Sequence, residues 1–514
     1  MPTLKRYLYY FAVILVHAGS AFVTTCGTSL VVPIATSQLK MEANSANFIF
    51  GGVMSIVNFF LQIIAGVISD NSTSKFGRRK TFIVPGAIIA CLGMILMGYS
   101  KLFGILFGDN DNLVFDDNET STSIFSSFSF SFSETSNSGL GHYVFHPFGF
   151  LFCLAGSVTM SIGNAFYGVC ARAIISDVIP FEEQQTVQFL NMVTANVSYC
   201  IYYFSCAIMA ETEWFYYVVF AIGITVVIIT TTITTIFVKE EQYQPEKKNE
   251  TCSSCKNCGD AFCHIPKKVL VLIFLLFVSA LSISPYSLNI NNYVGENYYN
   301  GDAHMNDDQF KKGIKMNNYA QAVACICGCI AAMIFPFVSK GKEVLFYIGS
   351  NILTTVTVVI YVVLNYCDDN VGDASAGVVA GLFITTIFNQ IASVATQSVP
   401  WAFFKKVSPA KHMGVYSGMM MSVYLVSGVA SSLVTSALLS IYDDLVYVFI
   451  YQIVVLVIMC GCSFLLFYVQ KEKKNESDYH YDGLNSDITE TTENANADNA
   501  KKGDYDLLLS KSTE

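Results

Sequence analysis

The sequence predicts an all-α polytopic membrane protein with twelve transmembrane helices in two pseudo-symmetric six-helix halves. Three observations support this fold class. Of the 514 residues, 53% are hydrophobic and 13% are charged, which is more apolar surface than a soluble protein of this size buries in one core. Apolar runs of about 20 residues, the length that crosses a bilayer, recur along the whole chain. A polar segment rich in Cys and Lys separates them into two groups of six.

The expected transmembrane helices follow one another at short intervals in most of the chain. The first apolar run lacks a small-residue cleavage site and is too long for a cleavable secretory signal, so we expect it to remain as the first helix. The remaining runs are identified by length and hydropathy alone. The twelve helices are expected at residues 8–34, 46–68, 81–103, 145–170, 186–209, 215–238, 268–290, 317–338, 344–364, 375–399, 414–440 and 446–470.

Positive charge predicts the orientation. If both termini are cytosolic, the cytosolic segments hold all but five of the 29 Lys and Arg residues. The five exceptions are Lys40, Lys101, Lys311, Lys312 and Lys315. Because cytosolic loops are enriched in Lys and Arg, we expect an integral, multi-pass protein with both termini in the cytosol. The membrane, plasma or endosomal/lysosomal, stays open.

The two groups of helices have a similar layout. In each group a short basic loop follows the second expected helix, at residues 75–80 and 340–342. Two similar halves joined by a cytosolic linker are the organisation of many secondary transporters. The predicted organisation is 1–238 for the first half with an extracytosolic insert at about 104–143, 239–267 for a cytosolic Cys-rich linker, 268–470 for the second half and 471–514 for an acidic cytosolic tail.

The most specific motif is GVISDNSTSKFGRRK, residues 66–80. Asp70 ends the second expected helix, and Gly77, Arg78 and Arg79 follow in the loop. A carboxylate beside guanidinium groups and a helix N-terminus is stabilised by charge and by the helix dipole, whereas the plain alternative is a basic loop that obeys the charge rule. The motif resembles the signature loop of the major facilitator superfamily. The resemblance implies a cytosolic latch between the halves that governs transport rate.

The wide spacing between Asp70 and Gly77 resembles more particularly the sucrose/proton symporter branch, in the glycoside–pentoside–hexuronide:cation symporter group. Further stretches resemble this branch in the same order along the chain. They are Gln62 with Gly66, Asn164 with residues 170–173 and Asp177, residues 292–295 and 298–301, and residues 398–402 with residues 414–418. The resemblance implies the major facilitator fold and a secondary active or facilitative transporter of sugar-like neutral solutes that works by alternating access, with or without proton coupling.

The chain departs from this branch where coupling is concerned. The branch carries two acids around a Thr in its seventh helix, whereas this chain has Ile290, Asn291 and Asn292. An Asn side chain cannot gain and lose a proton, so this protein couples differently or is a facilitator. The substitute candidates for coupling are His17, Arg172, Asp177 and Glu296.

His17 lies well inside the first expected helix, where an ionisable residue is a functional candidate, and histidine titrates near physiological pH. The alternative is a neutral His17 hydrogen-bonded to a neighbouring helix. For Arg172 and Asp177 the alternative is a structural ion pair at the membrane interface.

Amide side chains within the expected helices are candidates for solute binding. Amides match the dense, neutral donors and acceptors of a sugar, with aromatic rings as platforms. A hydrogen bond between helices is the alternative for each amide. The expected helices hold no strong basic cluster, which argues against an organic-anion or phosphate substrate. The substrate-binding candidates are Asn58, Gln62, Asn164, Asn191, Asn196, Gln390, Gln397 and Trp401.

The linker contains a C-x2-C-x2-C-x4-C-H motif, formed by Cys252, Cys255, Cys258, Cys263 and His264. Four thiolates, or three with the imidazole, can hold a structural zinc ion. Acylation of membrane-proximal cysteines is an equal alternative, and the cluster can also have no defined role. No other cofactor is expected.

Two polar regions lie outside the helices. The insert at 104–143 carries the glycosylation sequon of Asn118 and is expected to be disordered or to form an exposed strand. The acidic tail is expected to be disordered. Its Tyr481 and Leu484 and the pair Leu508-Leu509 resemble sorting signals, which predicts sorting adaptors as partners.

Other functions remain open at this stage. The fold also fits a carrier of an amino acid, a nucleoside or a drug, or a membrane receptor or sensor that transports nothing. An enzyme and an ATP-driven pump are not expected, because the sequence shows no nucleophile–base set and no phosphate-binding Gly loop. The expected partners are a small solute and membrane lipid, with no nucleic acid.

Overall fold

The computed structural model describes residues 3–39, 41, 43–70, 72–109, 146–180, 183–210, 212, 214–240, 265–301, 308–367, 374–408, 413–442 and 444–471. Within these ranges the chain is helical and contains no strand. Twelve of its helical segments are long and apolar enough to cross a membrane, which confirms the predicted fold class. The chain divides into one unit of residues Met1–Ser463 and a second of Phe464–Glu514.

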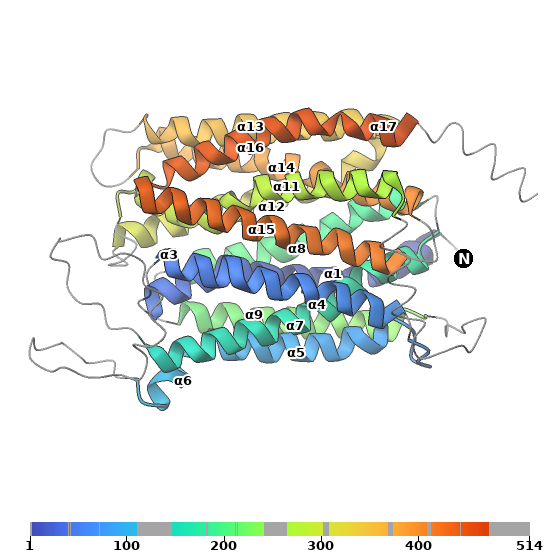
Figure 1. Ribbon diagram of the computed structural model, residues 1–514, viewed down its shortest axis with the longest axis horizontal. Coiled ribbons are helices and arrows are strands. Elements are labelled where there is room, and N and C mark those ends of the chain that lie inside the picture. Colours follow the sequence, from blue (N-terminus) through green and yellow to red (C-terminus); the bar gives the residue numbers. More distant parts are fainter. Residues whose placement is uncertain are drawn as a thin grey trace, which may run out of the picture. The chain divides into compact units, whose positions relative to one another are not determined.

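The first half of the first unit runs from blue to green in Figure 1. Its first two membrane spans, Arg6–Gln38 and Phe48–Asp70, each pass through a π-helical segment. Its elements are α1 (Thr3–Ser29), α2 (Val31–Pro33), η1 (Ile34–Gln38), α3 (Ala43–Ala46), η2 (Asn47–Val53), α4 (Met54–Asp70), α5 (Lys80–Gly98), α6 (Ser100–Leu106), α7 (Pro147–Val178), α8 (Gln184–Met209) and α9 (Phe215–Phe237).

The second half runs from green to red and lies beside the first in Figure 1. Its elements are α11 (Lys267–Tyr293), η5 (Val294–Tyr298), α12 (Asp308–Val338), α13 (Glu343–Asn365), α14 (Ala376–Val407), α15 (Met413–Tyr442) and α16 (Val446–Ser463). The second unit contributes α17 (Leu465–Lys471) to the described residues.

Several helix boundaries differ clearly from those predicted. The expected segment 81–103 ends at Gly98, and α6 begins at Ser100. Helix α12 begins at Asp308 instead of 317 because its first turns carry lysines, which lower the local hydropathy without preventing a helix. Helix α14 continues through Pro400 to Val407 because a helix can extend beyond the hydrocarbon core.

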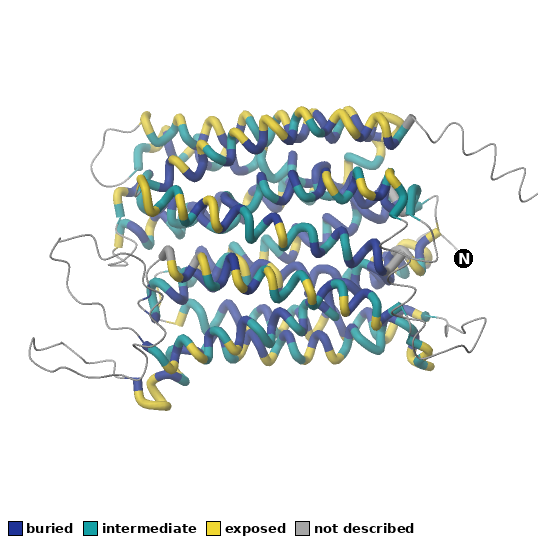
Figure 2. Tube along the Cα trace, viewed as in Figure 1, coloured by how far each residue is buried: buried dark blue, intermediate teal, exposed yellow. Residues whose placement is uncertain are grey.

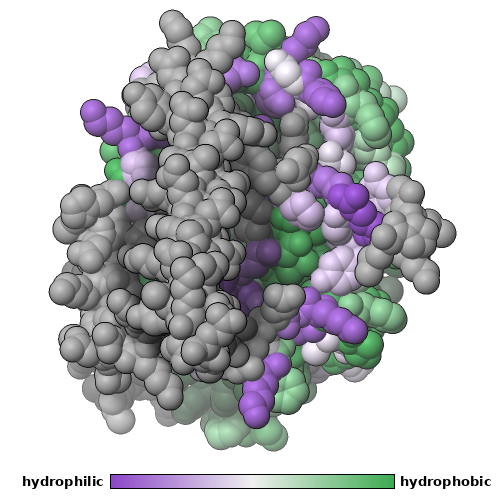
Figure 3. Space-filling view, turned by 90° about the vertical axis from the view of Figure 1, so that its right-hand side faces the viewer, coloured by the Kyte–Doolittle hydropathy of each residue, from purple (hydrophilic) through white to green (hydrophobic). Residues whose placement is uncertain are grey.

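Side-chain exposure fits a protein surrounded by lipid. Large apolar side chains such as Ile88, Trp214 and Phe337 are 65%, 68% and 82% exposed. Figure 2 shows such exposed positions alternating with buried ones along the helices. Figure 3 looks along the helices, and hydrophilic side chains gather on the end face while hydrophobic ones lie along the flanks. A band of apolar side chains between polar ends is what a bilayer requires.

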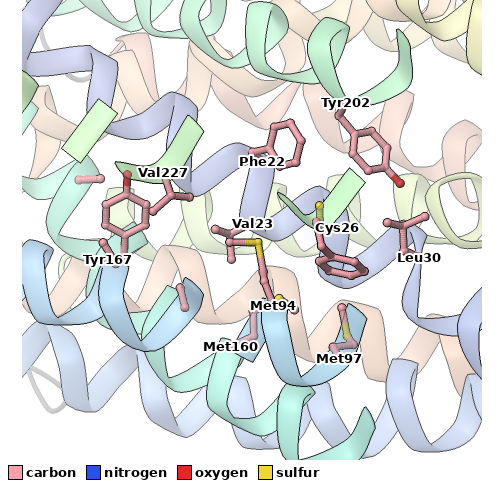
Figure 4. Packing of buried hydrophobic residues seen from close by; sticks show 14 of the residues in the cluster. Phe22, Val23, Cys26, Leu30, Met94, Met97, Met160, Tyr167, Tyr202 and Val227 are labelled. Atoms are coloured by element: carbon pink, nitrogen blue, oxygen red, sulfur yellow. The ribbon is translucent and has the colours of Figure 1, made fainter. Parts of the chain in front are cut away.

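Each half has its own buried apolar cluster. In the first half, side chains from five helices meet around α1 (Figure 4). The ring of Phe22 on α1 lies 5.7 Å from that of Tyr202 on α8, edge to face. Met94 of α5 and Met160 of α7 fill the space on the other side of the cluster. The residues labelled in Figure 4 are Phe22, Val23, Cys26, Leu30, Met94, Met97, Met160, Tyr167, Tyr202 and Val227.

Helices α5 and α7 pack backbone against backbone. A Cβ atom at Gly93 would lie 2.3 Å from the backbone N of Met160, and one at Gly163 would lie 2.2 Å from that of Ala90. Only glycine permits such an approach. At one end of this pair, Asp109 accepts hydrogen bonds from the N–H groups of Phe148 and Gly149, at 3.1 and 2.8 Å. This carboxylate caps the first turn of α7.

The halves contact each other along two seams, α4 with α15 and α8 with α12. The α8–α12 seam includes Phe189 with Phe335 and Phe204 with Tyr319, with ring centres 6.2 and 6.3 Å apart. In the α4–α15 seam, a Cβ atom at Gly418 would lie 3.4 Å from the carbonyl oxygen of Gln62.

Candidate functional site

A cavity of about 340 Å³ lies between the two halves. Its wall is built from α1, η2, α4, α7 and α8 on one side and from α11, α14 and α15 on the other. Residues 17–28 of α1 and 54–62 of α4 line it, so it reaches from the middle of the helices toward the end opposite Asp70. The volume is that of a small-molecule site.

The cavity collects seven of the predicted site residues. Five are from the substrate-binding set and two are from the coupling set. They are Asn58, Gln62, Asn164, Gln397 and Trp401, together with His17 and Arg172.

Asn164 joins the first and fourth spans at the cavity wall. Its Oδ1 accepts a hydrogen bond from the Ser20 hydroxyl at 3.2 Å, and its Nδ2 donates one to the Thr24 hydroxyl at 3.1 Å. The buried Oε1 of Gln62, on the facing helix α4, has no hydrogen-bond partner among the described residues. The wall therefore offers fixed polar groups and an acceptor that is free to bind a hydroxyl group.

Three predicted substrate-binding residues lie outside the cavity. Gln390 of α14 donates from Nε2 to Oδ1 of Asn196 on α8, at 2.5 Å, so this pair forms a hydrogen bond between the halves. Asn191 is buried in α8, away from the cavity lining. For Asn196 and Gln390 the structure thus favours the alternative role, a contact between helices.

Arg172 projects from α7 toward α14 and stacks on Trp401. Its guanidinium carbon lies 4.9 Å from the centre of the Trp401 ring, which is a cation–π geometry. Its Nε is buried and has no hydrogen-bond partner in the described part of the chain. Arg172 does not pair with Asp177, which binds Arg78 and Arg79 instead, so the predicted alternative of a structural Arg172–Asp177 pair is wrong.

His17 lies on α1 in the same cavity. It is 5% exposed, and its Nδ1 has no hydrogen-bond partner among the described residues. Of the coupling candidates, His17 and Arg172 therefore face the space where a solute would lie. Glu296 lies in η5, after the end of α11, and does not line the cavity.

The motif of residues 66–80 forms an ion network at the end of the helices, here called the gate network. Arg79 has no exposed surface. Its Nε donates to Asp177 at 2.9 Å, its Nη1 to the Ser69 hydroxyl at 2.6 Å and its Nη2 to Asp70 at 2.5 Å. Arg78 donates to the same Oδ2 of Asp177 at 2.7 Å.

The carboxylate of Asp177 and the guanidinium of Arg79 in the gate network are held in their charged forms. Burial alone would raise the pKa of Asp177, but the positive charges of Arg79 and Arg78 outweigh it, so this pKa lies below its ordinary value. Burial would lower the pKa of Arg79, but the charges of Asp177 and Asp70 raise it. Asp177 therefore stays ionised at physiological pH in this conformation and is a poor coupling group.

Sequence analysis missed Glu240, which completes the gate network. Its carboxylate accepts hydrogen bonds from the backbone N–H of Arg79 at 2.8 and 3.0 Å and from that of Lys80 at 3.2 Å. These bonds cap α5, where a negative charge is favourable. Gly77 has a φ of 106°, and a Cβ atom there would lie 2.4 Å from Glu240 Oε2.

The contacts of Arg79 with Asp70, Asp177 and Glu240 join elements of the first half. They link α4, α5, α7 and the segment after α9. The latch between the halves stays a prediction. The contacts fix the ends of these elements against one another.

Several predicted sites lie outside the described residues. They are the linker cysteines Cys252, Cys255, Cys258 and Cys263 with His264, the sequon at Asn118 and the sorting signals of the tail. Within the described ranges no group of three or more His, Cys, Asp or Glu residues could hold a metal ion.

The family model of the Major Facilitator Superfamily matches residues 122–430. This chain belongs to the major facilitator superfamily. Its family and fold are those of transporters, and with twelve apolar helices the chain is an integral, multi-pass membrane protein.

Curated superfamily members similar to the chain are sucrose transport proteins, as the resemblance predicted. The rice (Oryza sativa subsp. japonica) sucrose transport protein SUT1 is 22% identical over 347 residues, which cover 64% of this chain and 61% of that protein. The Arabidopsis thaliana sucrose transport protein SUC3 is 33% identical over 96 residues, which cover 18% and 16%. The chain thus aligns with less than two thirds of the length of these relatives.

Solved structures of other superfamily members share the fold at low identity. A bacterial homologue of the iron transporter ferroportin, in an outward-facing state, matches with a TM-score of 0.58 and 10% identity, covering 88% of this chain and 98% of that one. The human organic anion transporter MFSD10 matches with a TM-score of 0.57 and 10% identity, covering 90% and 100%.

Proposed function

We propose that this chain carries sugar-like, polyhydroxylated solutes across a membrane by alternating access. The observation that carries the proposal is the cavity between the halves, whose wall combines amide side chains with an indole platform at Trp401. Hydroxyl groups of a sugar can both donate to and accept from amides, and its apolar faces can stack on an aromatic ring. The similarity to sucrose transport proteins supports the same solute class.

The position of the cavity suggests how access alternates. The lining extends from the middle of the helices away from the gate network, while toward the network α4 and α15 approach closely at Gly418 and Arg172 stacks on Trp401. We expect solute to bind from the end opposite the gate network in this conformation. Exposure to the other side then requires the halves to part along the gate ends of both seams.

The remaining assignments belong to the same proposal. Both termini and the gate network would face the cytosol, with the network setting the transport rate by holding the ends of the first half. His17 is the candidate for proton coupling because it lies inside the cavity. The Cys-rich linker would hold zinc or an acyl group, and the tail would bind sorting adaptors.

Uptake by purified protein in liposomes tests the proposal. Radiolabelled mono- and disaccharides would be offered with and without an imposed pH gradient, and saturable uptake is expected for at least one of them. Uptake that rises with an inward proton gradient would establish proton symport, whereas uptake that ignores the gradient would establish a facilitator. Failure of folded protein to take up any sugar would overturn the solute class.

Two amides of α14 form a matched pair of variants. Gln397 lines the cavity, whereas Gln390 binds Asn196 outside it. We expect Gln397→Leu to raise the KM for the sugar about fivefold, since one lost hydrogen bond is worth about 1 kcal/mol. Gln390→Leu should change the maximal rate and leave KM nearly constant. Equal effects of the two variants on KM would remove Gln397 from the solute site.

A further inference from the structure

One cation of the cavity has no acidic partner among the residues that the structure describes. The chain contains four arginines. Arg6 pairs with Glu183, and Arg78 and Arg79 pair with the acids of the gate network. Arg172 alone makes no ion pair with a carboxylate of the described residues, although it lines the cavity between the halves.

The surroundings of Arg172 leave its charge uncompensated. The groups that face it are His17 on α1, Tyr199 on α8, Tyr424 on α15 and Trp401 on α14. None of these is a carboxylate. The indole ring compensates part of the charge from one face, but the buried Nε remains without a hydrogen-bond acceptor in the described part of the chain.

The guanidinium of Arg172 in the cavity is suited to bind an anion. Burying a positive charge inside a membrane protein is unfavourable unless it is paired. Arg presents its donors in a planar fork that matches the two oxygens of a carboxylate, and it can keep an aromatic stack while it does so. Among the described residues of the lining, the only other basic one is His17, so the site suits a single negative charge better than a doubly charged phosphate.

We propose that Arg172 anchors the carboxylate of a monoanionic, polyhydroxylated solute, with Trp401 as its platform. This inference rests on the proposed function, because it uses the same cavity and the same amides to bind hydroxyl groups. With the carboxylate on Arg172, the hydroxyl groups of the solute would extend toward Gln62, Asn164 and Gln397. The anchor departs from the expectation from sequence, which disfavoured anions because no basic cluster is visible in the helices.

The position of the two tryptophans provides a direct assay. Trp214 is 68% exposed in the turn before α9 and does not line the cavity, whereas Trp401 touches the proposed anchor. In a Trp214→Phe variant of the full chain, Trp401 is the only indole. Its fluorescence therefore reports binding beside Arg172 in purified protein, with no need for transport.

Three probes with the same six-carbon chain separate charge from hydroxyl groups. D-Gluconate carries a carboxylate and hydroxyls, D-sorbitol replaces the carboxylate by CH2OH, and hexanoate keeps the carboxylate alone. We expect gluconate to change Trp401 fluorescence saturably with a Kd roughly tenfold below that of sorbitol. Sodium chloride at equal ionic strength should leave the signal unchanged.

The preference for gluconate should depend on Arg172. In the Trp214→Phe background, Arg172→Gln should remove the preference while sorbitol binding stays measurable. Arg172→Lys should keep part of it, because the charge remains but the planar fork is lost. Thermal unfolding of each variant shows that it is folded, and the comparison of probes in the Arg172-containing protein does not depend on any of these variants.

The outcomes separate the two proposals. Sorbitol binding as tightly as gluconate, chloride reproducing the signal, or no saturable signal with any probe would overturn the anchor. Hexanoate binding as tightly as gluconate would support the anchor and overturn the polyhydroxylated solute of the proposed function. A gluconate preference that survives Arg172→Gln in folded protein would also overturn the anchor.

Discussion

The gate network allows a comparison between two adjacent arginines that share one acid. Arg79 is fully buried and makes side-chain hydrogen bonds to Asp177, Ser69 and Asp70. The side chain of Arg78 is 22% exposed and forms an ion pair with Asp177 at 2.7 Å. We compare Arg79→Gln with Arg78→Gln because both remove one positive charge from the same loop.

The two variants should differ strongly in how much stability they lose. Removing one partner of a buried ion pair costs about 3–5 kcal/mol because the remaining charge is left uncompensated. The side chains of Asp70 and Asp177 are 20% and 21% exposed, so water partly solvates the carboxylates that lose their partner. We therefore expect Arg79→Gln to lower the free energy of unfolding by about 3 kcal/mol. Arg78→Gln removes a partly exposed pair, worth about 1 kcal/mol or less.

Thermal and denaturant unfolding of the purified variants in one detergent gives the two free-energy changes. Arg79→Lys is a useful third variant, since an ammonium group cannot reproduce the geometry of three partners. The loss in free energy of unfolding should decrease in the order Arg79→Gln, Arg79→Lys, Arg78→Gln. A loss of stability for Arg78→Gln equal to that for Arg79→Gln would refute the argument that burial of the arginine decides its contribution.

Three further predictions concern the same end of the protein and the linker. Gly77→Ala should lower stability by about 2 kcal/mol, because the positive φ is strained for alanine and its Cβ atom would clash with Glu240. Gly341 has a φ of 77° and nothing within 4 Å of its Cβ position, so Gly341→Ala should cost only the backbone strain. Denaturant unfolding of the two variants measures both losses of stability. Because the pKa of Asp177 is lowered in the folded protein, its stabilising contribution is present above the ordinary carboxyl pKa of about 4 and is lost as pH falls through the lowered value. The difference in unfolding temperature between wild type and Asp177→Asn should therefore shrink below about pH 4, and a difference that stays constant with pH would contradict this assignment. If the linker binds zinc, elemental analysis should find one ion per chain that Cys255→Ser with Cys258→Ser removes, while hydroxylamine-labile acylation would identify the alternative.

The fold was predictable because a bilayer leaves little choice. Each crossing needs about 20 apolar residues, so hydropathy identifies helices even where their ends are misplaced, as at Asp308. The hydropathy of a segment does not show which face of its helix points toward the cavity. Asn164 and Asn196 are both amides of expected helices, yet one faces the cavity and the other binds Gln390 of the opposite half. Which face of a helix carries which role is decided by packing between helices.

The gate network and the Arg172 site show two further limits of sequence reasoning. Glu240 binds a loop 161 residues earlier in the chain, and no local pattern connects the two. Arg172 and Asp177 are close in sequence, but residues five positions apart do not face each other on a helix, where neighbours are three or four apart. Their separation places one in the cavity and the other in the ion network.

The capped beginning of α7 has a practical consequence for protein engineering. The carboxylate of Asp109 holds the N–H groups of Phe148 and Gly149, and α5 and α7 already touch backbone to backbone. The chain positions on either side of residues 110–145 are therefore kept together by contacts that do not involve those residues. Exchanging this stretch for a short Gly/Ser tether, or for a rigid carrier protein whose termini lie close together, should preserve folding. Such a chimera would provide a fiducial for electron cryomicroscopy on one face of the protein.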